Sequence, residues 1–581
     1  MTELEDIVMK KTKQEVSKRK VLVTAALPYI NNVPHLGHIV GSHLPADIFA
    51  RYCRTKGYDV MFVGGSDDNG TPAVIAAREI GVDIDTFEDK VYGEHKKIYD
   101  WFGISYDNFS RTSRPVHHQT TLDFFKRIQE NGYISEGKLE SFYCPKDDRF
   151  LPDRYVKGSC PKCGNPESFG DQCEKCGTFL ETKELESPKC TLCGTTPYLK
   201  ESNHLFLRLD KLSDQTEKWL NTKEGVWRPQ VLNQALGWIK EGLLPRCITR
   251  DLEQGVKVPV KGFEDKVFYV WFDAPIGYIS ATKEAAPDRW EEFWKGSDSE
   301  IFHFLGKDNI PFHTIFWPSM LLANGEFKLP HQVVGLQYLN YEGGKFSKSK
   351  KRGVFCESLV KSGLDADVMR SYLTFLIPEG NDTEFRWSDF QSRVNDEVIG
   401  SFANFVNRTV SFAYSKLDGN ISRPTSSRIS DADRAFADTI AEKRKEVEEH
   451  LEKAELRDAF GKILSISREG NKYFDHNAPW KLIKEDRART NDVIYNCLSL
   501  CRTLAVLSSP YVPKASQKIW DQLSLEGKVD NPGNWDDSKA ADTQRSYDVK
   551  KPEILFKKIT PESVEELKTI ASNPIDLKEL F

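Results

Sequence analysis

The stretch LPYINNVPHLGHIVGS, Leu27 to Ser42, places two histidines three residues apart where an apolar run ends and a helical pattern begins. Histidines at this spacing can be zinc ligands, core residues or contacts to phosphate. If the helix begins near Pro34, His35 and His38 lie on its first turn and on roughly one face. The unpaired amides and the dipole of a helix N-terminus favour an anion, so two imidazoles there would suit a phosphate group.

The sequence around this stretch alternates strand-like and helical segments. The apolar run VLVTAA, residues 21–26, precedes it, and Pro45 predicts a kink or bulge in the helix that follows. Apolar residues recur in that helix at four-residue steps: Val40, Leu44, Ile48 and Tyr52. Further strands are expected at DVMFVGG (59–65), VFYVWF (267–272), IFHFLG (301–306) and HQVVGL (331–336). We therefore expect an α/β fold whose Rossmann-like parallel sheet begins before an insertion and is completed after it.

The insertion is marked by clustered cysteines, since seven of the chain's 12 fall within about 50 residues. In a reducing compartment such clustering indicates metal binding and not disulfides. Cys160, Cys163, Cys173 and Cys176 form two C-x-x-C pairs separated by nine residues. Two such knuckles can hold one Zn²⁺ tetrahedrally, so a closed structural zinc site is expected here.

A second site is predicted from a less regular pattern. Cys190 and Cys193 form a third knuckle, while the segment CPKD offers Cys144 and puts Asp147 where a second cysteine would stand. Because a carboxylate can ligate zinc, these four residues can form another structural site. The alternative is a relic knuckle that binds no metal.

Composition narrows the class of protein. At 581 residues, with 39% hydrophobic and 29% charged residues, the chain is expected to form several globular domains. No apolar run is long enough to span a membrane, and the charged first twenty residues lack a secretory signal, so a cytoplasmic location is expected. The net charge of −6 excludes a uniformly positive surface but not a local basic face for nucleic acid.

Beyond about Asp389 the pattern predicts a helix bundle. Long helical segments cover residues 389–417, 431–456 and 491–509. The last forty or so residues, which include DNPGNWDDSKAADTQ, are expected to be weakly ordered.

The loop GGKFSKSKKRG, residues 343–353, carries lysines at 345, 348, 350 and 351 among small residues. Read alone, it could equally be a solvated basic loop. HLGH resembles the HIGH signature of class I aminoacyl-tRNA synthetases, and KFSKS resembles their KMSKS loop, with Phe346 in place of methionine. The knuckle insert, VWFDAPIGY and NAPW make the likeness, over residues 20–540, most similar to the methionyl-tRNA synthetase family.

The resemblance implies a reaction and its residues. Methionine would attack the α-phosphate of ATP, and the resulting adenylate would transfer its methionyl group to tRNA(Met), with Mg²⁺ accompanying the ATP. His35, His38, Lys345 and Lys348 would stabilise phosphate charge, and Lys348 is expected to cause the larger loss when mutated. Gly306 and Asp308, at the end of a predicted strand, would contact adenosine.

The resemblance also implies a methionine pocket. Its members are Ala26, Leu27, Tyr29, Asp67, Trp271, Ala274, Pro275, Tyr278, His313 and Trp317. A thioether favours an aromatic slot, and the substrate ammonium needs a carboxylate, for which Asp67 is preferred to Asp68. Tyr29 and His313 would offer polar groups near the sulfur.

In the predicted bundle, Asn404 and Arg408 stand four residues apart on one helix face, and Trp480 follows a proline. In the family an asparagine, an arginine and a tryptophan at these positions read the CAU anticodon. Stacking of unpaired bases on aromatic and guanidinium planes is the expected mode of such recognition.

The expected organisation has seven parts. They are an N-terminal extension (1–19), the first half of the catalytic domain (20–115), a connective insertion with the knuckles (116–265), the second catalytic half (266–340), a lysine-loop and stem-contact region (341–395), an anticodon-binding bundle (396–540) and a tail (541–581). A monomer is expected. The alternatives are a synthetase for isoleucine, leucine, valine or cysteine, and a zinc-containing RNA-binding protein that lacks catalysis.

Overall fold

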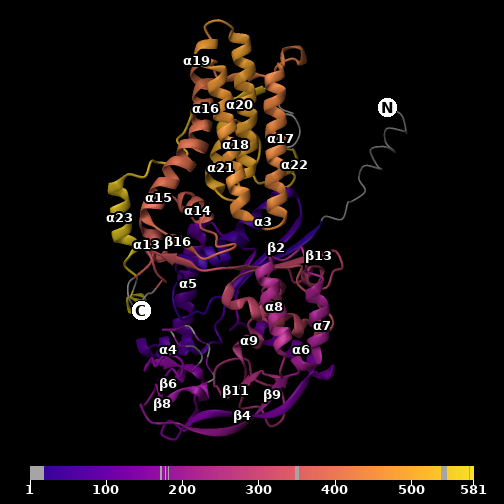
Figure 1. Ribbon diagram of the computed structural model, residues 1–581, viewed down its shortest axis with the longest axis vertical. Helices are drawn as coiled ribbons and strands as arrows, with labels where there is room; N and C mark the ends of the chain where they lie inside the picture. The colour runs from indigo at the N-terminus through magenta and orange to yellow at the C-terminus, as the bar shows by residue number, and fades with distance from the viewer. Residues whose placement is uncertain are drawn as a thin grey trace, which may run out of the picture.

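A five-stranded parallel sheet lies near the middle of the computed structural model (Figure 1). The model describes residues 19–170, 173, 175–176, 178, 180, 182–346, 352–537, 546–574 and 576–581. The strands follow the spatial order β14 (Gln332–Leu336), β13 (Ser299–Gly306), β1 (Lys20–Ala25), β2 (Asp59–Ser66) and β3 (Asn108–Arg111). β1 is central and pairs in parallel with both β2 and β13. Strands from both sides of the insertion therefore share one sheet, as predicted.

The HLGH stretch leads from β1 into a helix with a bulge. The short helix α2 (Leu36–His38) runs into a π-helical segment η1 (Ile39–His43) and then into α3 (Leu44–Lys56). Pro45 stands at the start of α3, directly after the π-helical turns, so the predicted bulge is confirmed. A proline lacks the amide hydrogen that regular α-helical bonding would use there.

One predicted strand is wrong. VFYVWF forms only a two-residue strand β12 (Val267–Phe268), paired with β11 (Thr249–Arg250), before helices α9 (Val270–Asp273) and α10 (Ile276–Ala285). A short, continuously apolar run has no periodicity that separates a strand from a buried helix. Here Phe272 and Ile276 are buried on the helical path.

The insertion is built on a long antiparallel pair. β4 (Ile134–Cys144) and β9 (Tyr198–Leu207) run side by side at the bottom of Figure 1. The other elements are β5 (Arg149–Phe150), β6 (Val156–Ser159), β7 (Ser168–Phe169), β8 (Glu186–Cys190), α7 (Leu209–Asn221), α8 (Pro229–Glu241) and β10 (Arg246–Cys247). The apolar cluster around the knuckles is small, so it offers little stability of its own.

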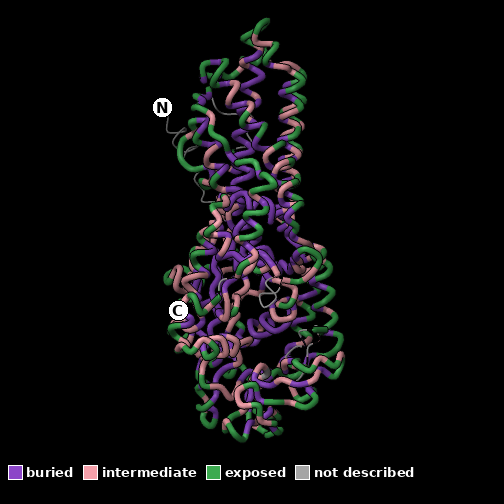
Figure 2. Tube along the Cα trace, turned by 90° about the vertical axis from the view of Figure 1, so that its left-hand side faces the viewer, coloured by how far each residue is buried: buried purple, intermediate pink, exposed green. Residues whose placement is uncertain are grey.

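The predicted C-terminal helix bundle is present and stands above the sheet in Figure 1. Its main helices are α16 (Asn404–Lys416), α17 (Asp431–Glu452), α18 (Leu456–Asn477), α20 (Arg487–Ser508) and α21 (Pro513–Gln522). Figure 2 shows buried residues continuing along the bundle and into the sheet domain. The core is accordingly shared, since one apolar cluster includes Phe49 of α3 and Leu504 of α20.

The expectation of a weakly ordered tail is wrong for residues 546–571. β18 (Ser546–Asp548) pairs with β17 (Asn420–Ser422), and α23 (Pro561–Ala571) contacts α13 (Cys356–Lys361). The amide of Phe355 donates to the carbonyl of Ala571 over 3.0 Å. This segment is attached to the rest of the fold by buried apolar residues, which include Tyr547, Leu555, Phe556 and Leu567. Its polar composition alone predicts a weakly ordered tail.

The remaining helices connect the sheet, the insertion and the bundle. They include α4 (Thr71–Ile80), α5 (Ile84–Phe102), α6 (Pro115–Glu130), α11 (Trp290–Trp294), α12 (Trp317–Asn324), α14 (Ala366–Phe375), α15 (Trp387–Arg393), α19 (Pro479–Leu482) and α22 (Asn534–Asp537). Two further strands, β15 (Leu339–Tyr341) and β16 (Thr383–Phe385), pair in parallel beside the lysine loop. None of the described helices combines the length and apolar character needed to cross a lipid bilayer.

A charged capping box secures the first turn of α17. The amide of Ser430 donates to Asp433 over 3.0 Å, and Arg489 of α20 donates to the same carboxylate over 2.8 Å. Burial opposes ionisation of Asp433, but the hydrogen bonds from Arg489, Tyr473 and Ser430 outweigh it and hold its pKa below the usual range.

We predict that Asp433→Asn lowers the free energy of unfolding by about 1–3 kcal/mol at pH 7. Because the folded-state pKa is depressed, this stabilisation is present above the unfolded-state pKa of about 3.9 and is lost as the pH falls towards the folded-state value. Denaturant unfolding at pH 7 and pH 3.5 checks this. The exposed Asp438→Asn is the control, and an Asp433 effect of the same size at both pH values would contradict the prediction.

Candidate functional site

The two histidines of HLGH cap the helix that they begin. Nδ1 of His35 accepts from the amide of Gly37 over 3.0 Å, and Nδ1 of His38 accepts from the amide of His35 over 3.1 Å. A side chain on Gly37 would meet the His35 ring at 2.7 Å, which explains the glycine between them. In a neutral ring whose Nδ1 accepts, Nε2 carries the hydrogen, so each imidazole can donate from Nε2.

The lysine loop meets this helix end directly. The ring of Phe346 stacks on the ring of His35, with centroids 4.9 Å apart and planes at 12°. Phe346 also lies 5.7 Å from the ring of Tyr341, so it acts as an apolar anchor. Lys345 is exposed, with its Nζ 5.7 Å from the ring centroid of Tyr338. Lys348 lies outside the described residues.

The end of β13 lies close to the same loop. Gly306 precedes a short turn, η4 (Lys307–Asn309), and the hydroxyl of Tyr338 donates to the Asp308 carboxylate. The ammonium of Lys307 stacks on Tyr338 at 3.9 Å. Asp308 and Lys345 therefore both lie beside the side chain of Tyr338, a residue that was not predicted from the sequence.

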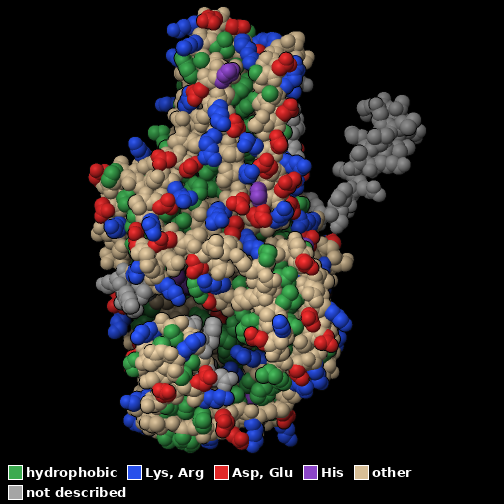
Figure 3. Space-filling view, viewed as in Figure 1, with side chains coloured by type: hydrophobic (Ala, Val, Ile, Leu, Met, Phe, Trp, Pro, Cys, Tyr) green, Lys and Arg blue, Asp and Glu red, His purple; other side chains and the backbone are tan. Residues whose placement is uncertain are grey.

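The ten residues predicted for a methionine pocket come from three places. The loop after β1 supplies Ala26, Leu27 and Tyr29, and Asp67 directly follows β2. The segment that contains α9, α10 and their junction supplies Trp271, Ala274, Pro275 and Tyr278. His313 lies in η5 (Phe312–Phe316), and Trp317 is the first residue of α12. Leu27 packs against α10 so closely that a side chain on Gly277 would meet it at 2.9 Å. The indole of Trp271 donates to the hydroxyl of Tyr29 over 3.0 Å. Figure 3 shows the surface hollowed where the insertion meets the sheet domain, with hydrophobic side chains at its edge.

A chain of ring contacts continues inward from the pocket. Nε2 of His313 accepts from the Tyr278 hydroxyl over 2.9 Å, while its Nδ1 donates to the carbonyl of Asn309 over 3.0 Å. Burial lowers the pKa of His313 to about 4, so the ring stays neutral near pH 7. Trp317 is fully buried and donates to His303 over 3.3 Å. His303 was not predicted, because inside an apolar strand it is indistinguishable from a core residue.

Two buried carboxylates face this region. Asp67 Oδ1 and Asp273 Oδ1 are both buried without a hydrogen-bond partner. The other oxygen of Asp273 accepts from the Asn69 amide over 2.6 Å and lies 3.4 Å from Nε2 of His117. Burial, followed by the charges of Asp273 and Asp68, raises the pKa of Asp67 well above its usual range. Such a pair suits a primary ammonium, which supplies both hydrogen bonds and positive charge.

Asp68 has a different role from Asp67. Its two oxygens accept from the hydroxyls of Ser66 and Ser113, each over 2.6 Å, and from Arg111 over 2.7 Å. Asp273 was not predicted from the sequence, although it stands inside VWFDAPIGY. The available signal was a single carboxylate in an otherwise apolar helix.

Both cysteine groups converge as the spacing predicted. In each group the four ligand atoms lie within 4.8 Å of one another. Sulfur–sulfur distances are 3.6 Å for Cys163–Cys173 and 3.9 Å for Cys160–Cys176. Tetrahedral zinc with four thiolates requires about 3.8 Å. In the second group, Cys144 and Cys190 each lie 3.1 Å from Asp147 Oδ2, so the carboxylate occupies the fourth corner.

Two of the three predicted anticodon residues, Arg408 and Trp480, lie beside one ring of the bundle. The guanidinium of Arg408 lies 4.6 Å from the ring of Phe474, and Trp480 lies 6.1 Å from the same ring. Trp480 is 45% exposed. Asn404 is exposed one turn before Arg408 on α16. Phe474 therefore supports both neighbours, and sequence reasoning did not single it out.

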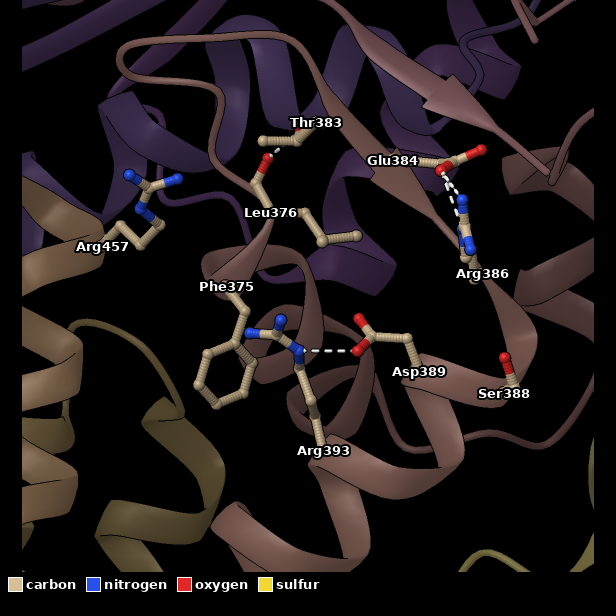
Figure 4. Close-up of a pocket in the computed structure, with 9 residues that line it drawn as sticks. All are labelled: Phe375, Leu376, Thr383, Glu384, Arg386, Ser388, Asp389, Arg393 and Arg457. Carbon is tan, nitrogen blue, oxygen red and sulfur yellow. Dashed lines mark hydrogen bonds and ion pairs between the residues drawn. The ribbon is translucent and has the colours of Figure 1, made fainter. Parts of the chain in front are cut away.

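A separate pocket of about 590 Å³ lies between the bundle and the strand–helix segment after the lysine loop (Figure 4). Arg457 of α18 reaches it from the bundle side, while Arg386 and Arg393 border it opposite. Arg393 is paired with Asp389 at 2.8 Å and Arg386 with Glu384. A smaller pocket of about 490 Å³ borders Lys345 and Asp382.

Comparison with known proteins decides the family. A sequence model described as tRNA synthetases class I (M) matches residues 21–410, and one described as the anticodon binding domain of methionyl tRNA ligase matches residues 423–572. The chain belongs to the methionyl-tRNA synthetase family. The predicted class I methionine–tRNA ligase activity is therefore confirmed.

Relatives of this synthetase match along most of its length. A methionine–tRNA ligase from Methanopyrus kandleri is 40% identical over 558 residues, 95% of this chain and 82% of that protein. One named cytoplasmic, from Xenopus laevis, is 43% identical over 88% of this chain and 57% of its own. A solved structure of Mycobacterium tuberculosis methionyl-tRNA synthetase in complex with methionyl-adenylate has a TM-score of 0.77 and 25% identity, covering 93% of this chain and 99% of that one.

We predict that Asp67→Asn stabilises the ligand-free synthetase. Because the folded-state pKa of Asp67 is raised, ionising it opposes folding increasingly as the pH rises from the unfolded-state pKa through the folded-state one. The variant removes this cost, so its melting temperature should exceed wild type by more at pH 8 than at pH 5. Asp68→Asn is the matched control and should destabilise, since it breaks the bonds to Ser66, Arg111 and Ser113. Equal destabilisation by both substitutions would refute the argument.

Proposed function

We propose that this synthetase activates L-methionine with ATP and transfers the methionyl group to tRNA(Met). The observation that carries the proposal is the stack of Phe346 on His35, because it brings the HLGH and KFSKS motifs to one helix N-terminus. In the first step a methionine carboxylate oxygen bonds to the α-phosphorus as the bond to pyrophosphate breaks. In the second, the terminal ribose hydroxyl of tRNA displaces AMP.

The residues at that helix end would act by position and charge. His35 and His38 would donate from Nε2 to phosphate oxygens, and Lys345 and Lys348 would neutralise charge that develops on the triphosphate. Mg²⁺ would accompany ATP through phosphate oxygens. Gly306 and Asp308 would hold the adenosine, supported by the hydrogen bond from Tyr338 to Asp308.

The pocket would hold methionine by its two ends. Asp67, supported by Asp273, would bind the ammonium with oxygens that have no other partner. The side chain would lie among Ala26, Leu27, Tyr29, Trp271, Ala274, Pro275, Tyr278, His313 and Trp317. Neutral His313 donates to a carbonyl and accepts from Tyr278, so it would present a defined polar edge near the thioether.

Anticodon bases would bind at the far end of the bundle. The match of residues 423–572 to an anticodon-binding domain supports a tRNA partner. Asn404 would hydrogen-bond a base, while the planes of Arg408 and Trp480 would stack on unpaired bases of CAU. We also propose that the protein acts as a monomer. The cytoplasmic name of the Xenopus laevis relative supports the same location here.

We propose one structural Zn²⁺ in each cysteine group. Cys160, Cys163, Cys173 and Cys176 would supply four thiolates, and Cys144, Asp147, Cys190 and Cys193 three thiolates and a carboxylate. The distances fit tetrahedral coordination without an open position, so the role is structural. The small apolar cluster around them makes metal the main support of this part of the fold.

ATP–pyrophosphate exchange tests the proposed activity. Wild-type protein with Mg²⁺ should catalyse exchange with methionine alone among the twenty amino acids. Lys345→Ala, Lys348→Ala and His38→Asn should each lower the exchange kcat by about 10²–10³, with little change in the KM for methionine. Lys445→Ala, on the exposed face of α17, is the control. Exchange with another amino acid would overturn the pocket, and no exchange by folded protein would favour an RNA-binding role.

Metal analysis tests the two zinc sites. Purified protein should contain two zinc ions per chain, and Cys163→Ser and Asp147→Ala should each lower the content by one. The Asp147 variant should also become more sensitive to proteolysis between residues 144 and 193. Two ions in Asp147→Ala would show that the carboxylate is not a ligand, and one ion in wild type would leave that group without zinc.

A further inference from the structure

A single buried arginine joins the bundle to the sheet domain. Arg370 of α14 is completely buried, and its guanidinium pairs with Asp47 of α3 at 2.8 Å. It also donates to the carbonyls of Pro510 over 2.7 Å, Tyr511 over 2.8 Å and Phe102 over 2.9 Å. One side chain therefore contacts three separate segments: α3, the end of α5 and the corner after α20. Removing it would take this donor from three buried carbonyls and one of the partners from the Asp47 carboxylate.

The same helix holds the corner between α20 and α21 with a second charge. Asp367, three residues before Arg370, accepts from the amide of Ala515 over 2.8 Å, in the first turn of α21. Arg370 binds the carbonyls that follow α20. Each charge thus has the sign that the adjoining helix end favours, with a carboxylate at an N-terminus and a guanidinium beyond a C-terminus. α14 therefore binds both helix ends at the corner between α20 and α21.

At the other side, Asp47 ties Arg370 to the helix that carries the ATP motif. α3 continues without a break from η1 and α2, whose first turn contains His35 and His38. Asp47 is itself fixed, because Oδ1 accepts from the amide of Ser105 over 2.7 Å and from its hydroxyl over 2.6 Å. Arg51 donates to Oδ2 over 2.9 Å. A shift of the corner between α20 and α21 would consequently change the position of α3.

We propose that Arg370 is a positioning residue that sets the bundle relative to the HLGH helix, so that a tRNA bound through its anticodon presents its acceptor end to the adenylate. This inference rests on the proposed tRNA(Met) charging. Arg370 touches no substrate, so it contributes to transfer and not to adenylate formation. The predicted signature is a separation of the two half-reactions.

The experiment measures both half-reactions in Arg370→Gln and Arg370→Lys. Methionine-dependent ATP–pyrophosphate exchange, corrected by active-site titration, should stay within about twofold of wild type. Single-turnover transfer of methionine from the purified enzyme–adenylate to full-length tRNA should fall about tenfold or more in Arg370→Gln. The Kd for tRNA should change little, because the anticodon residues are intact. Arg370→Lys keeps the charge opposite Asp47 and should lose less.

Arg502→Lys alters another buried arginine, in the middle of α20, and should leave the ratio of transfer to exchange unchanged. Equal loss of exchange and transfer in Arg370→Gln, unchanged transfer, or loss of tRNA binding would each overturn the inference. If neither Arg370 variant folds, Asp47→Asn replaces them with the same expected separation. A wild type without methionine-dependent exchange would instead overturn the proposed function itself.

Discussion

The end of the sheet that carries the HLGH and lysine-loop segments depends on one contact, the stack of Phe346 on His35. It joins a loop after β15 to the first turn of the helix that leaves β1, two segments separated by about half of the chain. The contact has two requirements. His35 must cap its own helix, which needs glycine at position 37, and the lysine loop needs a flat apolar side chain at position 346. With both in place, the described part of the lysine loop is held against the helix end that His35 caps.

The pocket proposed for methionine has a different electrostatic character. Two carboxylates are buried there with oxygens that lack partners, and their mutual repulsion disfavours the empty state. The neighbouring Asp68, by contrast, is held by an arginine and two hydroxyls. The fold therefore places two incompletely paired carboxylates at the position where, in the proposed function, a cationic group would bind. This is the usual trade between stability and binding at a functional site.

Features that depend on neighbours in the sequence were predictable, and those that depend on distant neighbours were not. HLGH, the C-x-x-C pairs and the bulge before Pro45 follow from local spacing. Asp147 was predictable because it fills a position in a repeated pattern. His303, Asp273 and Tyr338 were missed because their roles come from side chains brought in by other elements.

Two expectations about local structure failed for related reasons. The apolar run VFYVWF predicts a strand, but its second half forms the start of α9, and α10 follows. Its buried residues pack into the apolar cluster that the insertion shares with the sheet. The C-terminal segment was polar on average, yet a few apolar residues attach α23 beside α13. In both cases tertiary packing outweighed the average character of the segment.

The order of strands in the sheet also has a consequence for how the chain reaches its native state. β1 has β2 as a nearby partner, but its other edge pairs with β13, so Thr24 and His303 meet across 279 residues. Until β13 has been synthesised, one edge of the central strand has no native partner. Pairings between such distant segments form slowly because a long loop must close first. The insertion and its cysteines emerge within that interval, so the two cysteine groups can come together before the sheet whose halves they separate is complete.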